Sequence, residues 1–220
     1  MSRGQTNIWQ GANGVVVGGN NNTAGTDAVV AGGDHNSAGV NGFVAGGANN
    51  VSAGGWGAVI GGKFGSTGDR YGGVALGGGS FDSATPGQAQ VYRQILRATS
   101  PDTTPIRVTW NAETASQNTT CVLLDNSAAL LNLYLIGKQG NTDQVVLTCL
   151  GALIVRGASA AATVIVGSPT FSVIASTAGA AGTTATLTAD TSIGSPNITV
   201  TPPTSADWTW VCLYEAVEII

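Results

Sequence analysis

Charged side chains are scarce in this chain of 220 residues, because Asp, Glu, Lys and Arg together make up 9% of it, against about 25% in an average globular domain. The eight basic residues stand singly along the chain, and the net charge is −4. No cationic stripe can therefore neutralise a row of phosphates, which argues against nucleic acid as a partner. The surface of such a protein must be neutral and polar.

Long hydrophobic runs are also lacking. Nowhere do about 18 strongly apolar residues follow one another, as a membrane-spanning helix requires. The first eleven residues carry no apolar stretch after Arg3 that would form a secretion signal. We therefore expect no membrane insertion and assembly in the cytoplasm of the cell that makes the protein.

Reactive side chains are few. The three cysteines, Cys121, Cys149 and Cys212, have no metal-binding spacing and lie in apolar runs, which indicates buried free thiols made in a reducing cytoplasm. His35 is the single histidine and has no Cys, Asp or Glu partner at a fixed spacing. No carboxylate pair or Gly-x-Ser-x-Gly elbow can be assigned. We expect no catalytic residue, no metal and no cofactor, so the chain is predicted not to be an enzyme.

Glycine, by contrast, is abundant and periodic. Gly-Gly pairs at 18/19, 32/33, 46/47, 61/62 and 77/78 recur at spacings of 14, 14, 15 and 16 residues. Each unit reads as an apolar triplet, the Gly-Gly pair and a polar turn. Such a period is typical of stacked supersecondary repeats, which here predict a β-roll or β-helix stalk over residues 11–87, after an N-terminal segment of residues 1–10.

The apolar triplets predict self-association. Alternate residues of a strand point to opposite faces, so a triplet that is apolar throughout needs cover on both faces. One coil supplies cover only on its inside, and the outer face must be buried by another chain. Three coils close symmetrically around one axis, so we predict a homotrimer. We assign the middle column of the triplets to the trimer interface: Val16, Val30, Val44 and Val59.

The turn residues are predicted to have structural tasks. The Gly pairs allow positive φ and close backbone approach where the chain turns. Asn22, Asn36 and Asn50 recur at a fixed offset, which suits either left-handed turn positions or a stacked amide ladder.

These units resemble the 14-residue head repeats of trimeric bacterial adhesins and the glycine-rich repeats of phage tail fibres. The resemblance covers roughly residues 11–80. Adhesins carry a secretion signal and a C-terminal membrane barrel, neither of which is found here, so the phage resemblance agrees better with the sequence.

Residues 88–220 are expected to form an antiparallel, jelly-roll-like β-sandwich. Short apolar runs with β-branched residues recur between turn signals, and eight to ten strands favour a sandwich. The expected strands are 92–99, 106–110, 121–125, 130–138, 143–157, 163–167, 170–175, 184–189, 197–201 and 208–219. Strand and helix patterns compete at 126–137, which we interpret as strand. Trp208, Trp210, Cys212 and Tyr214 share one face of the last strand and are expected in the core.

The segments RYGGVALGGGSF, QVYRQILRATSPDTTP and NITVTPP...WTWVCLYEAVEI resemble the C-terminal module of phage tail-fibre and virion-surface proteins. This resemblance implies a virion-surface protein whose partners are its own copies, other virion proteins and a host-cell surface glycan. The first interpretation is a distal tail-fibre or tailspike trimer that recognises a host polysaccharide. A trimeric capsid decoration protein is the alternative, and a bacterial adhesin fragment is the third.

Two places are candidates for glycan contact. Trp110 ends an expected strand and opens a polar stretch, where a large aromatic ring can remain partly exposed. The turn at 138–143 places amide and charged groups between long strands, as recognition loops on rigid scaffolds often do. The candidate receptor-binding residues are Trp110, Lys138, Gln139 and Asn141.

Overall fold

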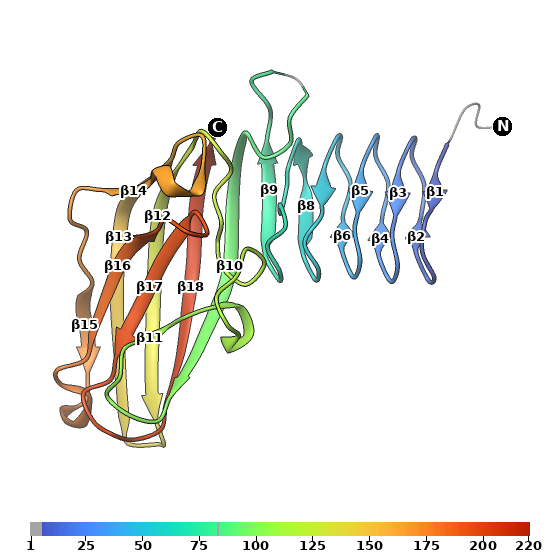
Figure 1. Ribbon diagram of the computed structural model, residues 1–220. Coiled ribbons are helices and arrows are strands. Elements are labelled where there is room, and N and C mark those ends of the chain that lie inside the picture. Colours follow the sequence, from blue (N-terminus) through green and yellow to red (C-terminus); the bar gives the residue numbers. More distant parts are fainter. Residues whose placement is uncertain (1–5, 83) are drawn as a thin grey trace. The chain divides into compact units, whose positions relative to one another are not determined.

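The computed structural model describes residues 6–82 and 84–220 (Figure 1). The regular structure of these residues consists of strands and three short 3₁₀ segments, so the protein is all-β, as predicted. It divides into two compact units. Unit 1 contains the residues up to Arg93 together with Val217–Ile220, and unit 2 contains Gln94–Ala216. From the sequence we placed the boundary between the repeat stalk and the sandwich near residue 88.

Unit 1 contains a β-solenoid of about five turns. Its coils contribute short strands to two parallel sheets (Figure 1). The strands of the first sheet are β1 (Ile8–Trp9), β3 (Thr23–Ala24), β5 (Ser37–Ala38) and β7 (Val51–Ser52). Those of the second sheet are β2 (Val15–Val16), β4 (Val29–Val30), β6 (Phe43–Val44), β8 (Ala58–Lys63) and β9 (Val74–Gly78).

The repeat keeps equivalent residues in register. Val15 pairs with Val29, Val29 with Phe43, and Phe43 with Ala58. The strands β3, β5 and β7 lie where the sequence indicated only a polar turn. They form because Ala24, Ala38 and Ser52 are small enough to be fully enclosed within the coil.

The second glycine of each pair permits the coils to stack closely. At Gly19, Gly33, Gly47 and Gly62, φ lies between 81° and 89°. A Cβ atom at these positions would lie 2.0–2.2 Å from a glycine carbonyl oxygen of the next coil. The predicted positive φ and close approach are therefore confirmed, and other residues would force the coils apart.

A buried asparagine ladder joins the coils. The Oδ1 atom of Asn22 accepts a hydrogen bond from the N–H of Asn36 at 3.0 Å, and Oδ1 of Asn36 accepts one from the N–H of Asn50 at 3.0 Å. The Nδ2 atom of Asn36 donates to the carbonyl oxygens of Gly32 at 2.8 Å and Gly47 at 3.0 Å. Of our two interpretations the ladder is confirmed, while the left-handed positions belong to the preceding residues Asn21, His35 and Asn49.

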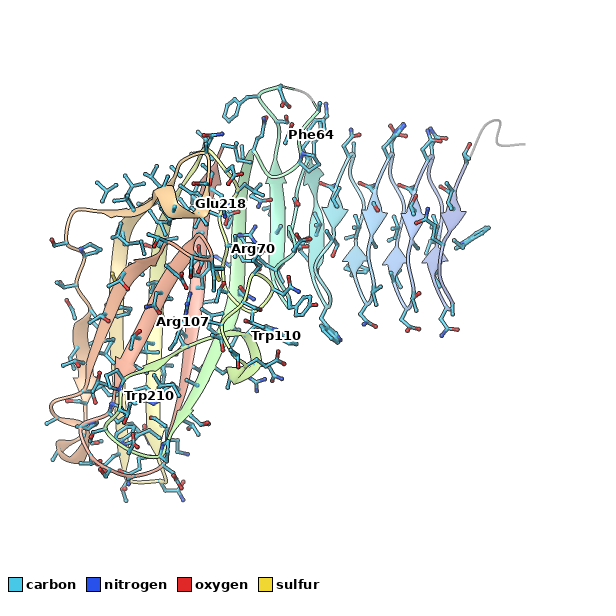
Figure 2. All side chains as sticks on the ribbon, in the orientation of Figure 1. Phe64, Arg70, Arg107, Trp110, Trp210 and Glu218 are labelled. Carbon is cyan, nitrogen blue, oxygen red and sulfur yellow. The ribbon has the colours of Figure 1, made fainter. Side chains whose placement is uncertain are left out.

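A buried ion pair links distant parts of unit 1. Arg70 pairs through two hydrogen bonds with Glu218, and both side chains are less than a tenth exposed (Figure 2). Glu218 also accepts a hydrogen bond from Nε2 of Gln90 at 2.6 Å. The guanidinium carbon of Arg70 lies 3.6 Å from the ring centroid of Tyr92, a cation–π contact. These contacts join β18 (Trp208–Ile219) to the segment between β8 and β9.

Unit 2 contains two antiparallel sheets. The larger has the strand order β14, β13, β12, β18, β10, with β15 also paired to β13, and the smaller has the order β11, β17, β16. The elements are β10 (Ala89–Ser100), β11 (Ile106–Arg107), η1 (Trp110–Ala112), β12 (Ser127–Gln139), β13 (Asp143–Arg156), η2 (Ala160–Ala162), β14 (Thr163–Val166), β15 (Ser172–Ser176), η3 (Ala178–Ala180), β16 (Thr184–Asp190), β17 (Ser195–Thr201) and β18 (Trp208–Ile219).

The core of unit 2 lies on one face of the larger sheet. Leu131, Leu133 and Leu135 of β12 are fully buried, as are Trp208 and Trp210 of β18. The two indole rings stack with centroids 5.2 Å apart. The expectation that the last strand's aromatic residues belong to the core is confirmed.

The ambiguous segment 126–137 lies almost entirely within β12 and is a strand, as expected. The strand expected at 121–125 is absent, because this segment runs as an irregular turn. Its apolar residues Cys121 and Leu123 are buried all the same. The N–H of Leu123 donates to the carbonyl of Gly194, and its carbonyl accepts from Arg156, so single contacts replace a strand ladder.

Candidate functional site

The middle column of the apolar triplets lies inside the solenoid. Val16, Val30, Val44 and Val59 are each 9% exposed or less in the single chain. Our assignment of these residues to the trimer interface is therefore wrong. The period-2 geometry of the strands points the middle residue of each triplet into the coil, where residues of the same chain already cover it.

The flanking columns of the triplets lie on the outside. The large apolar side chains exposed there are Val15, Val17, Phe43, Ile60, Val74 and Leu76, with exposed fractions from 38% to 72%. A hollow of about 350 Å³ lies among Ile60, Val74, Leu76, Val91 and Arg93. We call the six exposed side chains Val15, Val17, Phe43, Ile60, Val74 and Leu76 the outer columns. Contiguous apolar surface of this kind marks an interaction site in soluble proteins.

The larger sheet of unit 2 has an apolar outer face as well. Leu130 pairs with Leu153, and Leu153 with Val166, so these three side chains form one row across the sheet. We call the exposed residues of this face the outer sheet face: Ile95, Leu130, Tyr134, Ile136, Leu150, Leu153, Val164, Val166 and Val211, all between 37% and 59% exposed. Both faces of this sheet are therefore apolar, although only one is covered by the chain's own core.

The residues predicted to contact a glycan are not brought together. Trp110 is half-buried and begins η1, directly after Thr109, which pairs with Arg97 near the end of β10 (Figure 2). Lys138 and Asn141 are exposed and Gln139 is half-buried, in and beside the turn that joins β12 to β13 at the lower end of Figure 1. Trp110 and this turn cannot form one compact site.

A cleft of about 740 Å³ lies between β14, β15 and the segment that joins them on one side and β16 on the other. We call it the β14–β16 cleft. Leu147, Ile165 and Leu187 contribute apolar side chains, and seven Ser and Thr residues also line it: Thr163, Ser168, Thr170, Thr183, Thr184, Thr186 and Thr188. Its lining includes no charged residue. The sequence reasoning did not find this cleft, although residues 157–189 form a stretch without any charge.

Thr163 is the unusual residue of the cleft. It is 2% exposed, and its Oγ1 atom has no hydrogen-bond partner within residues 6–82 and 84–220. A buried hydroxyl without a partner destabilises a fold by about 1–3 kcal/mol. The neighbouring Thr183 differs, because its Oγ1 donates to the carbonyl of Ala180 at 2.8 Å.

The charged residues of unit 2 form structural pairs. Arg107 binds Asp190 and also donates to Oγ of Ser195 at 2.8 Å (Figure 2 labels Arg107). Burial opposes ionisation of Asp190, but hydrogen bonds from Ser192, Arg107 and Ile193 outweigh it and lower the pKa of this carboxyl to about 2. Asp190 is thus held as an anion and does not exchange protons near neutral pH.

His35 lies at an exposed turn of the solenoid. Its Nδ1 atom is 2.9 Å from Oδ1 of Asp34, and this contact lowers the pKa of the Asp34 carboxyl. Among the described residues no three His, Cys, Asp or Glu side chains gather as metal ligands. In the same part of the chain no helix has the length and hydropathy to cross a bilayer.

The three cysteines form no disulfide bond and are buried. Burial raises the pKa of the Cys149 and Cys212 thiols, that of Cys212 to about 12. Such a thiol remains protonated and is a poor nucleophile.

No protein-family model and no curated protein matches the chain. Among solved structures the chain is similar to the tailspike protein of Acinetobacter phage vB_ApiP_P1, with a TM-score of 0.24 and 10% sequence identity. The alignment covers 92% of this chain and 47% of that protein, so the chain spans about half of the tailspike's length. A TM-score of this size does not establish a common fold, and the solenoid is assigned here from the chain's own strand pairing.

Proposed function

We propose that this chain is a non-enzymatic structural protein of the bacteriophage surface, a homotrimer that acts as a distal tail fibre or tailspike and recognises a host-cell polysaccharide. In this proposal the solenoid is the stalk, and the two sheets of unit 2 form a jelly-roll-like sandwich that presents its loops to the host. Its partners are two further copies of the chain, other virion proteins and the host glycan.

The observation that supports self-association is the apolar outside of the solenoid. The outer columns contain two side chains of the first repeat unit, one each of the third and fourth, and two of the fifth, and they belong to a chain with only 9% charged residues. Burial of apolar surface contributes about 25 cal/mol per Å². Because the columns run along the stalk, a sister copy aligned in parallel would cover all of them at once.

The outer sheet face of unit 2 supports the same proposal. Its nine large apolar side chains are exposed, and charged residues lie only beside them, as Arg93 and Arg97 do on either side of Ile95 and Lys138 does next to Ile136. On β18 the side chains of Val211, Val217 and Ile219 alternate with buried ones and point to one side of the strand. A single strand thus supplies exposed apolar residues to both units.

Host recognition is proposed from the neutral, polar character of the loops. Each copy keeps two separate candidate receptor contacts. One is Trp110, and the other is the turn with Lys138, Gln139 and Asn141. Weak sites on three copies would act together, since linked sites raise the effective concentration of one another.

Localisation on intact particles tests the proposal. Gold-labelled antibody against the purified chain should label the tail tip of phage particles that carry it, and the purified protein should compete with phage for adsorption to host cells. Labelling over the whole shell, together with normal adsorption, would contradict host recognition and indicate capsid decoration instead.

A further inference from the structure

We infer that the β14–β16 cleft binds an uncharged saccharide that carries methyl groups, such as an acetylated or 6-deoxy sugar. The inference rests on the proposed function and places the recognition site where no sequence pattern indicated one. It concerns unit 2 alone, since every lining residue belongs to that unit.

The size and form of the cleft suit a ligand. Its volume of about 740 Å³ falls within the range of roughly 300–1,000 Å³ that small-molecule sites occupy. The strands on its two sides belong to different sheets, because β14 and β15 pair with β13 while β16 pairs with β17. The segment between β14 and β15, in which Gly167 has a φ of 76°, also lines the cleft.

The lining determines the charge of the ligand. A carboxylate or phosphate that entered the cleft would lose water without meeting a cation, because no Lys or Arg lines it. Burial of an unpaired charge is strongly unfavourable. Acidic polysaccharides are therefore disfavoured as ligands of the cleft, and neutral polysaccharides are favoured.

The polar and apolar parts of the lining match a substituted sugar. Hydroxyl groups donate and accept hydrogen bonds, as sugar hydroxyls and acetyl carbonyls do. Ile165, Phe171 and Val173 offer apolar surface for a methyl group. Thr163 is the most specific feature, because this residue lines the cleft and its buried hydroxyl has no partner in the described chain. A ligand oxygen that formed a hydrogen bond with this hydroxyl would supply the partner that the fold does not provide.

Thr163→Val tests the inference, since valine keeps the shape and removes the hydroxyl. The full-length protein is first applied to an array of bacterial polysaccharides, neutral and acidic, and the affinity of the variant is then measured for the neutral glycan bound best. We expect the Kd to rise about five- to tenfold, which corresponds to the loss of one hydrogen bond. The urea concentration at the unfolding midpoint of the variant should equal or exceed that of the wild type. If the hydroxyl of Thr163 instead stabilised the fold, its removal would lower this midpoint.

Two further variants complete the experiment. Ala185→Phe fills the cleft and should abolish binding, and Thr199→Val removes a strand threonine hydroxyl outside the cleft and should leave the Kd unchanged. Methyl NMR of the wild-type protein provides an independent map, in which the glycan should shift the signals of Leu147, Ile165 and Leu187.

The outcomes separate the inference from the proposed function. Neutral glycan binding that survives both Thr163→Val and Ala185→Phe, or shifts methyl signals elsewhere, overturns the cleft as the site and leaves host recognition standing. Binding of acidic glycans alone also overturns the inference. Protein that binds no glycan and does not compete for host cells overturns both.

Discussion

Within the second coil of the solenoid, two adjacent residues have opposite environments. The side chain of Asn36 is buried, donates to the carbonyl of Gly32 in its own coil and bonds Gly47 and Asn50 of the next coil, whereas His35 has a φ of 54° and lies exposed at the turn. Asparagine suits both places for different reasons: its amide can bridge backbone groups, and its short side chain tolerates left-handed φ.

We predict that Asn36→Ala lowers the free energy of unfolding by about 3 kcal/mol, because it leaves a buried N–H and two carbonyl oxygens without side-chain partners. Urea denaturation followed by circular dichroism measures this. The matched control is His35→Asn, for which we expect a change of less than about 0.5 kcal/mol. Equal losses in the two variants would show that the ladder does not stabilise the coil.

Asp190 contributes to the stability of the fold in acid. Its pKa is lowered from 3.8 to about 2 in the folded protein, and its side chain is 14% exposed. A lowered folded-state pKa stabilises the protein above the unfolded pKa, and this contribution is lost as the pH falls through the folded pKa. We predict a loss of about 2 kcal/mol between pH 5 and pH 2 that Asp190→Asn abolishes. Unfolding curves at stepped pH measure it, and an unchanged pH slope in the variant would contradict it.

At the scale of elements, the Arg70–Glu218 pair determines how β18 joins unit 1. The two residues are 148 positions apart, and both side chains are almost fully buried. Removal of one partner leaves the other charge buried without compensation, which costs about 3–5 kcal/mol. The pair therefore matters more for holding these elements together than an exposed ion pair would.

We predict that Glu218→Gln and Arg70→Met each destabilise the protein by about 3 kcal/mol, and that the double variant loses about 2 kcal/mol less than the sum. A double-mutant cycle from urea denaturation measures this coupling. Lys63→Met, at an exposed lysine beside Phe64, is the control and should change stability by less than about 0.5 kcal/mol. Additive losses would mean that the two charges do not depend on one another.

At the scale of the whole molecule, the proposed trimer would cover the outer columns and the outer sheet face. We predict a native mass of about 65 kDa, three times the chain mass of 21.8 kDa. Val17→Asp in the solenoid and Val211→Asp in unit 2 should each shift the protein towards the monomer, because a buried carboxylate opposes association. Sedimentation velocity measures the mass.

Thr199→Asp, on the smaller sheet of unit 2, is the control and should leave the mass unchanged. A wild-type protein that sediments as a monomer at micromolar concentration would contradict the trimer. Dissociation by Val17→Asp alone would confine the contact to the solenoid.

The sequence alone determined the features that depend on near neighbours. The period of about 14 residues predicted a solenoid, since every coil presents the same residues to the next, and the glycines and asparagines predicted the close approach and the ladder. The alternation in 208–219 likewise placed Trp208 and Trp210 in the core. Each of these depends on strand geometry and local backbone freedom, which a short segment already contains.

Only the tertiary structure decided which face of a strand is enclosed and which distant segments meet. The middle valines turned out to face the inside of the coil, and residues 121–125 follow an irregular path because their partners, Arg156 and Gly194, come from elsewhere in unit 2. The pairing of Arg70 with Glu218 and the β14–β16 cleft likewise join residues from separate strands. Local pattern fixes the alternation of a strand, but the packing of the whole chain decides which alternate face is covered and what remains open.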